Sequence, residues 1–419
     1  MHNELRVNYS RLRARLDALG ELGAITGPNG ERGSARLALT DADKAGRDLV
    51  VSWMHDLSLD VRIDGIGNVV AIRGGRNADA APVMTGSHID TVRTGGLYDG
   101  NLGVLAGLEI IETLAERDVI TEHPIAVAFF TNEEGARFSP DMMGSLVYVG
   151  GLAIESALDV VGIDGVTVGA ELERIGYMGP WPSPGLAPHA FVELHVEQGP
   201  VLEEDGFAIG AVEGVQGISW QEITIVGQSN HAGTTPMRLR HDPGYVAASI
   251  AVFVRELALG LGHTQVGTVG AITLHPNLIN VVPGRATITV DLRNTDESIL
   301  QHAEQELAAY CIMLAANEGV TITSRTLARF EPVSFDSRMV DLVAATAAAQ
   351  GNTVMRLPSG AGHDAQMLAR VCPTAMVFTQ SHLGISHNPA EFTDDHNLEA
   401  GANVLLTVML QLASGKVLP

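Results

Sequence analysis

The chain has 419 residues, of which 46% are hydrophobic, and this length is enough for two domains that each bury a core. Its 49 acidic residues outnumber 26 basic ones, which gives a formal net charge of -23 at pH 7. A surface this negative repels phosphate backbones and anionic lipids, so nucleic acids and membranes are poor candidate partners.

The two cysteines, Cys311 and Cys372, lie far apart and match no metal or redox spacing, so we expect reduced thiols rather than a disulfide. The first residues, MHNELRVNYSRLRARL, contain neither the hydrophobic stretch nor the cleavage site of a signal peptide. The sequence also lacks an uninterrupted apolar run of about 18 residues, the length that a transmembrane helix needs. These features predict a cytoplasmic protein.

The first half of the chain alternates between helical and extended patterns. Residues 41–57 follow Thr40, a favourable N-cap, and place apolar side chains on one helical stripe, which predicts an amphipathic helix that covers a sheet. Residues 82–87 and 124–132 predict buried strands, and residues 103–117 between them predict a helix. A strand, a helix and a strand in this order indicate a crossover unit of a mostly parallel sheet.

The pattern changes between about residue 212 and residue 328. Alternating apolar and polar residues predict strands at 218–227, 267–274 and 285–294, with helices at 242–261 and 297–317. An antiparallel sheet with helices on one face fits this order. We therefore predict an α/β fold in which residues 1–212 and 329–419 form a domain with a mostly parallel mixed sheet flanked by helices, and residues 213–328 form an inserted α+β domain.

Side chains suited to metal binding recur where predicted strands end. In open α/β sheets, ligands bind at the carboxyl ends of the strands, and the strands at 82–87, 124–132, 190–196 and 374–380 would end there. Near these ends and in one glycine-bracketed turn lie His88, Asp99, Glu133, Glu134, His195 and His387. Histidines and carboxylates bind divalent ions such as zinc, and two such ions about 3.5–4 Å apart can activate a water molecule. The pattern therefore predicts a hydrolytic two-metal site.

The motifs around His88 and Asp99 are weak signals when each is taken by itself. In GSHIDTV, Asp90 could orient the His88 imidazole through its second ring nitrogen, or the pair could form an ordinary solvated turn. In GGLYDGN, the two carboxylate oxygens of Asp99 could bridge two ions, although a lone Asp-Gly more often marks only a turn. Only the combination of such motifs is informative.

The motif TNEEG is more specific, because two adjacent glutamates at the end of an apolar strand repel each other unless a cation neutralises them. One glutamate can bind metal while the other stays free. We expect Glu133 to be the free one and to act as the general base that takes a proton from the attacking water. A solvated strand end is the alternative.

The remaining histidines also have simpler interpretations. His195 ends the predicted strand at 190–196, where a core histidine is the alternative, and Gln198 follows it. We place Gln198 among the substrate-binding residues. In HLGISHNPAEFT, His387 has the more turn-like context and His382 could be merely structural, so we favour His387 as the ligand.

Together these motifs resemble a known family over nearly the whole chain, the dinuclear metal-dependent amidohydrolases related to aminoacylases and metallo-carboxypeptidases. The sequence is most similar to the amidase, hydantoinase and carbamoylase branch, which includes N-carbamoyl-L-amino acid hydrolase, β-ureidopropionase and allantoate amidohydrolase. The resemblance implies two divalent ions, one bound by His88 and His195, the other by Glu134 and His387, and both by Asp99. Zinc is the expected metal, although manganese, cobalt and nickel accept the same ligands.

The resemblance also implies that the larger domain is catalytic and that the inserted domain serves as a lid and in dimerisation. His231 in GQSNHAGTTPM would polarise the scissile carbonyl. Asn280 and Arg293 would hold the substrate carboxylate, often from the neighbouring subunit, and Gly362 in SGAGHDAQ would contact the substrate closely. An arginine fork matches a carboxylate with two hydrogen bonds, although a surface strand residue is the alternative for Arg293. His363 receives no ligand role.

The implied activity is hydrolysis of the ureido carbon–nitrogen bond of an N-carbamoyl-L-amino acid to ammonia, carbon dioxide and the amino acid. Glu133 would deprotonate the water and later protonate the leaving nitrogen, and closure of the inserted domain would bring His231 into place. Allantoate or another ureide, and N-acyl amino acids or dipeptides, are alternative substrates, since Arg93 stands where the family usually has proline. A metal-binding protein without turnover is the alternative from a different class, and the free Glu133 argues against it.

The resemblance further implies a homodimer that acts on a small anionic substrate. The apolar residues 245–254 of the predicted helix at 242–261 could form a surface between subunits. The same residues could instead pack on the sheet of their own domain.

Overall fold

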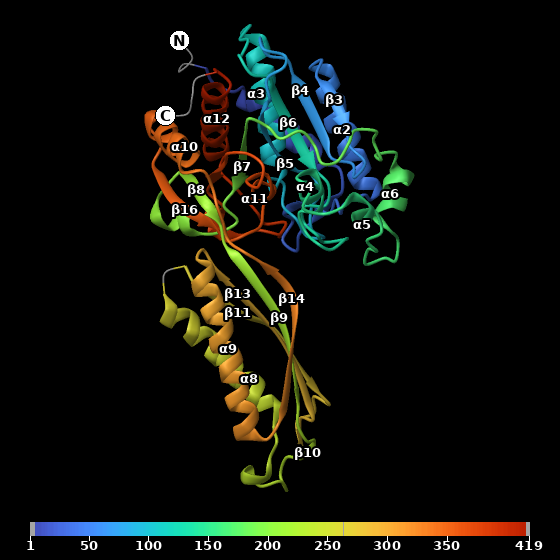
Figure 1. The fold of residues 1–419 in the computed structure, drawn as a ribbon, viewed down its shortest axis with the longest axis vertical. Coiled ribbons are helices and arrows are strands. Elements are labelled where there is room, and N and C mark those ends of the chain that lie inside the picture. The colour runs from blue at the N-terminus through green and yellow to red at the C-terminus, as the bar shows by residue number, and fades with distance from the viewer. Residues whose placement is uncertain (1–4, 263, 416–419) are drawn as a thin grey trace. The chain divides into compact units, whose positions relative to one another are not determined.

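The computed structural model describes residues 5–262 and 264–415, which divide into two compact units (Figure 1). The first unit contains the described residues up to Glu213 and from Ser334 on, and the second unit runs from Gly214 to Val333. We placed the second boundary at 328/329. The second unit extends further because strand β14 (Thr321–Phe330) pairs with the sheet as far as Phe330, which lies opposite Ile218.

The first unit is built on a 9-stranded sheet. Its strands are β3 (Asp60–Ile63), β4 (Val69–Arg73), β5 (Val83–His88), β6 (Ile125–Phe130), β7 (Ala190–Val196), β8 (Ile209–Val215), β15 (Val333–Ser334), β16 (Val354–Ser359) and β17 (Thr374–Thr379). The strand order is β15-β8-β17-β7-β5-β6-β4-β3, and β16 pairs with β8. The central strands β17, β7, β5 and β6 run parallel, whereas β8 and β4 pair antiparallel with their neighbours. The predicted mixed α/β sheet is confirmed.

Helices flank this sheet. They are α1 (Tyr9–Gly20), α2 (Asp41–Asp56), α3 (Asn101–Glu116), α4 (Met143–Tyr148), α5 (Ile154–Leu158), α6 (Val168–Ile175), α7 (Val201–Asp205), α10 (Ser337–Ala349), α11 (Asp364–Leu368) and α12 (Asp395–Leu412). Thr40 caps α2 by accepting the Asp43 backbone N–H, as the sequence predicts. All six residues of β6 are buried, as expected for a central strand whose two faces are both covered. The short strands β1 (Ala24–Thr26) and β2 (Arg32–Ser34) form a separate hairpin.

The parallel centre of the sheet determines where the metal-type side chains lie. Because β5, β6, β7 and β17 run in one direction, their carboxyl ends meet at one edge. His88 is the last residue of β5, and His195 is the second-last residue of β7. Glu133 follows the end of β6 by three residues. The topology therefore brings segments that are distant in the sequence to the same edge.

The second unit has a 4-stranded antiparallel sheet in the order β11-β13-β9-β14. The strands of this sheet besides β14 are β9 (Gly217–Val226), β11 (Val266–His275) and β13 (Arg285–Asn294), and the unit also contains β10 (Asn230–His231), β12 (Val281–Val282), α8 (Pro243–Leu261) and α9 (Glu297–Glu318). Helices α8 and α9 run side by side and pack on the sheet (Figure 1). This confirms the predicted antiparallel sheet, although β14 was not foreseen as its fourth strand.

Helix α8 bears on the expectation that no segment of the chain is long and apolar enough to span a membrane. This 19-residue helix contains an 18-residue window with a mean hydropathy of 1.5, so by length and composition alone it could cross a membrane. One side of it, with Val246, Ile250 and Val254, is buried in the core of the second unit. Another side is exposed, and Tyr245 and Leu259 are 56% and 73% accessible. One side of the helix therefore packs in the core of its own unit, and a surface between subunits on the exposed side stays a prediction.

Candidate metal centre

His88 presents one ring nitrogen to the candidate centre because the other is occupied. Its Nδ1 lies 2.9 Å from the backbone carbonyl oxygen of Asp90, which as an acceptor fixes the proton on Nδ1. Nε2 then faces Asp99, with 3.4 Å to Oδ1. The side chain is buried, so the imidazole is held in place by its surroundings.

The expected role of the Asp90 carboxylate was wrong. It does not orient His88, since the backbone carbonyl of Asp90 makes that contact. The carboxylate instead crosses to the end of β6 and accepts the backbone N–H groups of Glu133 at 3.2 Å and Glu134 at 3.3 Å. Asp90 therefore fixes the backbone that presents both glutamates.

Asp99 lies between two sets of histidines. Its Oδ1 is 3.2 Å from His195 Nε2 and 3.4 Å from His88 Nε2, whereas Oδ2 is 3.3 Å from His387 Nε2. Although burial alone would raise it, the contacts with these three histidines hold the pKa of Asp99 well below its usual range. A carboxylate whose two oxygens face different partners is suited to bridging two cations.

Glycine at position 100 permits this arrangement. Gly100 has a φ of 65°, and a Cβ atom built on it would lie 2.5 Å from the His88 ring. The backbone therefore passes directly beside the imidazole, which a side chain would prevent. The glycine-bracketed turn of the sequence thus has a steric function.

Two groups of donor atoms overlap at Asp99. His88, Asp99 and His195 have ligand atoms within 4.8 Å of one another, and so do Asp99, Glu134 and His387. These are the two ligand sets that the family resemblance implies. Nitrogen and carboxylate oxygen in such sets suit zinc, manganese, cobalt and nickel, so the residues present fit a divalent metal.

The electrostatics of the two glutamates also favour a cation. Burial, followed by the neighbouring carboxylates, raises the pKa of Glu133 well above its usual range, even though His88 acts in the opposite direction. Burial and the charge of Asp99 raise the pKa of Glu134 to about 8. Carboxylates gathered in a buried place repel one another, and a divalent ion would remove this cost.

Glu133 and Glu134 point to different partners. Glu134 Oε2 lies 3.3 Å from His387 Nε2, within the second donor group. Glu133 Oε2 lies 3.4 Å from His88 Nε2, beside the first group. Glu133 is thus placed next to the donors, where a base would need to be.

The structure also separates the two histidines of the 382–393 segment. His387 reaches Asp99 and has a φ of 53°, and the contact with Asp99 raises its pKa to about 9. His382 instead pairs with Glu203 at 2.7 Å. The segment therefore brings His387, and not His382, to the donor groups.

Gln198 lies within the centre itself. Its Nε2 donates to Asp99 Oδ2 at 2.9 Å and to Ser386 Oγ at 3.1 Å. Gly362 lies two residues before the start of α11, and a Cβ atom built on Gly362 would be 2.8 Å from the Met142 side chain. The backbone N–H of Met142 in turn donates to the Glu133 carbonyl at 2.7 Å.

His231, Asn280 and Arg293 belong to the second unit. His231 in β10 pairs with Val281 in β12, so His231 and Asn280 are close neighbours. Arg293 is far from both along the sheet. Arg285, at the end of β13 near β12, and Arg293 are eight positions apart along the strand. This amounts to about 26 Å at roughly 3.3 Å per residue.

Within one chain, Asn280 and Arg293 therefore lie too far apart to contact one small carboxylate together, and their shared role stays a prediction that involves a neighbouring subunit. Asn280 directly precedes β12, which pairs with β10 outside the 4-stranded sheet, whereas Arg293 lies at the end of β13 that is remote from Arg285. Within its own chain, Arg293 forms an ion pair with Asp291 at 2.9 Å and lies over the Trp220 ring at 5.8 Å.

One acidic residue of the centre was missed at the sequence level. Glu391 is buried, and its Oε1 accepts the backbone N–H groups of Tyr98 at 3.1 Å and Asp99 at 3.2 Å. Burial raises the pKa of Glu391 to about 7. The available signal was its position four residues after His387 in HNPAEFT.

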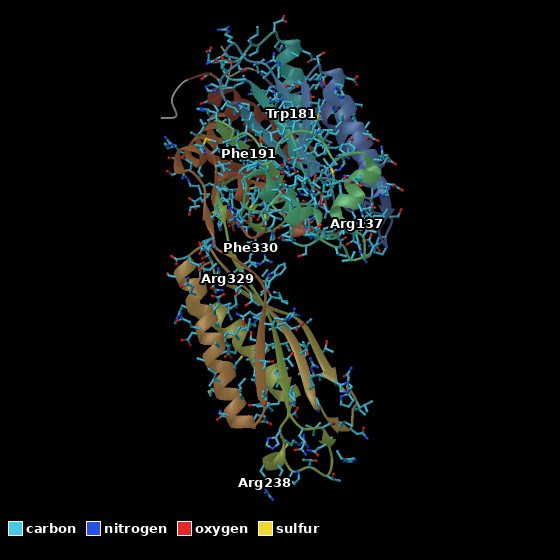
Figure 2. All side chains as sticks on the ribbon, turned by 45° about the vertical axis from the view of Figure 1, so that its right-hand side comes forward. Arg137, Trp181, Phe191, Arg238, Arg329 and Phe330 are labelled. Carbon is cyan, nitrogen blue, oxygen red and sulfur yellow. The ribbon has the colours of Figure 1, made fainter. Side chains whose placement is uncertain are left out.

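The centre is distinct from a large cavity in the same unit. That cavity has a volume of about 490 Å³ and is lined by residues that include Arg62, Asp64, Tyr148 and Trp181, the last of which is labelled in Figure 2. None of the donor residues lines it. Donor chemistry, rather than cavity size, therefore identifies the functional site.

A mixed α/β sheet with overlapping histidine and carboxylate donors at the carboxyl ends of its strands, and a further glutamate beside them, defines a metal-dependent hydrolase. Comparison with known proteins agrees, since residues 84–411 match the Peptidase family M20/M25/M40. The chain belongs to this family and is a hydrolytic enzyme.

Relatives match the chain over nearly its whole length. An N-carbamoyl-L-amino-acid amidohydrolase from Rhizobium meliloti is 40% identical over 97% of both chains. An allantoate amidohydrolase from Bacillus subtilis is 34% identical over 92% of this chain and 94% of its own. The solved structure of an amidase of the hydantoinase/carbamoylase family from Burkholderia multivorans is 44% identical, with a TM-score of 0.94, and covers 99% of this chain and 100% of its own.

Proposed function

We propose that this protein hydrolyses the ureido carbon–nitrogen bond of N-carbamoyl-L-amino acids, with release of the amino acid, carbon dioxide and ammonia. The observation that carries the proposal is the position of Asp99, whose two oxygens face His88 and His195 on one side and His387 on the other. The relative from Rhizobium meliloti supports the substrate class.

Two divalent ions, most suitably zinc, would be held by His88, Asp99, Glu134, His195 and His387. When bound, they supply a nucleophilic water at neutral pH and a Lewis acid for the scissile carbonyl. Asp99 orients the two donor groups with respect to each other, and Asp90 fixes the backbone from which Glu134 extends. Gln198 donates to the Oδ2 atom of Asp99, and we assign it to substrate binding.

Glu133 is the base in this proposal. Its Oε2 accepts a proton from the attacking water and later gives it to the leaving nitrogen. Its burial beside the donors favours proton uptake, because the charged carboxylate is poorly solvated there. His231 would donate to the developing oxyanion, an interaction that in other enzymes contributes roughly 3–4 kcal/mol.

Arg293 and Asn280 would bind the substrate carboxylate, with Gly362 allowing close approach. Because Asn280 lies near the Arg285 end of β13, and Arg285 and Arg293 are about 26 Å apart at roughly 3.3 Å per residue, we assign Asn280 and Arg293 to different subunits of a homodimer. One chain then supplies Arg293, and its partner supplies His231 and Asn280. The second unit would act as the lid and dimerisation domain.

The exposed side of α8 supports the homodimer. Tyr245, Val252 and Leu259 are 56%, 56% and 73% exposed and lie seven residues apart, so they share one helix face. The adjacent edge strand β11 adds Ile272, which is 50% exposed and lies opposite Ile288 on the face of the sheet that the helices cover. A second copy would cover this apolar surface, and sedimentation of the purified protein tests the association.

We place the enzyme in the cytoplasm.

Allantoate is the second candidate substrate, and the relative from Bacillus subtilis favours it. Ammonia release from N-carbamoyl-L-amino acids, allantoate, acetylated amino acids and dipeptides separates the alternatives. We expect the highest kcat/KM with a carbamoyl amino acid. Turnover of only the acetylated or peptide substrates would refute the proposal, and turnover of allantoate alone would shift it to the second candidate.

A further inference from the structure

Arg36 is a fully buried arginine whose guanidinium contacts the backbone beside His88 and the side chain of Asn101, which follows the turn that carries Asp99. Its Nε donates to the carbonyl oxygen of Ile89 at 2.7 Å, between His88 and Asp90. Its Nη2 donates to Asn101 Oδ1 at 2.8 Å, two residues after Asp99. One side chain therefore spans the two turns.

The same guanidinium also fixes the end of helix α1. Nη1 donates to the carbonyl oxygens of Leu19 at 3.0 Å and Leu22 at 2.7 Å, and to Ser34 Oγ at 3.1 Å. The backbone of Arg36 adds a second link to the first turn, because its N–H donates to Thr91 Oγ1 and its carbonyl accepts the Thr91 N–H.

These contacts differ from those of an ordinary buried ion pair. Among residues 5–262 and 264–415, no carboxylate lies within ion-pair distance of Arg36. Burial lowers the pKa of Arg36 to about 10, so the side chain stays charged at neutral pH. A buried charge is costly, and it is compensated here by carbonyl, amide and hydroxyl oxygens at fixed positions and, at longer range, by the charges of Asp43 and Asp90.

The position of these oxygens indicates what the charge does. The planar guanidinium presents its donors in a rigid fork, so the distance between Ile89 and Asn101 is set by a stiff group rather than by a flexible chain. Ile89 is adjacent to His88, and the Asn101 backbone N–H donates to the Asp99 carbonyl at 2.7 Å. The separation of the two donor turns therefore depends on Arg36.

We propose that Arg36 is a positioning residue of the metal centre, which holds the His88 and Asp99 turns at the separation that binding of a divalent ion requires. The inference rests on the proposed metal-dependent function. Groups that orient metal ligands from behind typically change metal affinity by about 10–100-fold when they are replaced.

The test measures zinc affinity by competition with a chromogenic chelator, starting from the metal-free full-length protein, together with its melting temperature. Arg36→Lys keeps the charge but cannot span both turns, so we expect zinc binding to weaken by about 10–100-fold. Asn101→Ala keeps Arg36 but removes the Nη2 contact together with the hydrogen bond from Asn101 Nδ2 to the Leu97 carbonyl at 3.2 Å, and it should weaken zinc binding in the same direction. In the double variant, Asn101→Ala should cost less than it does alone, because Arg36→Lys has already broken the contact between the two side chains and only the Leu97 hydrogen bond remains to be lost.

Arg11→Lys is the matched control. Arg11 is partly buried and ties α1 to α3 through Glu109 at 2.7 Å, but it does not contact either donor turn. Its substitution should lower the melting temperature and leave zinc affinity unchanged. If Arg36→Lys and Asn101→Ala behave like this control, Arg36 is merely structural and the inference is overturned.

Zinc binding distinguishes a failure of the metal-dependent function from a failure of the role assigned to Arg36. A wild-type protein that takes up no zinc in the competition assay would contradict the metal-dependent function itself. A wild-type protein that binds zinc tightly, with both variants binding equally tightly, would contradict only the role of Arg36. Should Arg36→Lys not fold, Asn101→Ala decides the question alone.

Discussion

The carboxylate of Glu391 accepts the backbone N–H of Asp99 at 3.2 Å and that of Tyr98 at 3.1 Å. The glutamate thereby fixes the turn from which Asp99 extends towards three histidines. Glu391→Ala should weaken zinc binding by about 10–100-fold, because the two N–H groups lose their acceptor. Glu391→Gln keeps one acceptor oxygen and should lose much less, and chelator competition distinguishes the two. Equal affinities for both variants would contradict this role.

Glu133→Gln tests the assigned base. The amide cannot take a proton from water, so kcat should fall by about 100- to 10,000-fold while the zinc content stays unchanged. Metal analysis and ammonia release on the same preparation give both values. Glu134→Gln is the comparison, since it should lose metal as well as activity. Full activity in Glu133→Gln would remove Glu133 from the mechanism.

Gly100→Ala tests the steric role of the turn beside His88. The new Cβ would lie 2.5 Å from the imidazole, so the variant should lose both stability and zinc affinity. Gly176→Ala is the control, because Gly176 also has a positive φ, 76°, but an added Cβ meets nothing within 4 Å. It should cost about 1–2 kcal/mol through backbone strain alone. Equal losses in thermal unfolding and in zinc affinity would refute the steric argument.

Zinc binding should be pH-dependent in a defined direction. In the metal-free protein the pKa of Glu134 is raised to about 8 and that of His387 to about 9. Both groups must lose their protons to bind metal, so affinity should rise as the pH rises from 6 to 9, and binding should release protons. Calorimetry in buffers of different ionisation enthalpy measures the release. His382→Ala should leave the profile unchanged, and a flat profile in the wild type would contradict the assignment.

Complementation between inactive variants tests whether two chains build one site. His231→Ala and Arg293→Ala should each be inactive. Co-expressed with two tags and purified as mixed dimers, they should regain activity, because one of the two sites then receives both intact side chains. An unselected mixture should recover up to about a quarter of wild-type activity in a symmetric dimer. Mixed dimers without activity would show that a single chain supplies both residues.

Much of the fold followed from local patterns in the sequence. Continuous apolar runs predicted β5, β6 and β7, and alternation predicted β9, β11 and β13, because burial on two faces or one leaves a direct trace in the residue order. The strand β14 escaped notice, since TITSRTLARF is polar and lies at the edge of its sheet.

The sequence by itself determined which donor atoms exist and, through the direction of parallel strands, the edge at which they gather. Only the tertiary structure decided which atoms meet. It gave the Nδ1 contact of His88 to a backbone carbonyl, directed the Asp90 carboxylate to Glu133, and separated Asn280 from Arg293. The physical reason is that donor type and strand direction are local properties, whereas hydrogen-bond partners depend on backbone positions set by packing between distant segments.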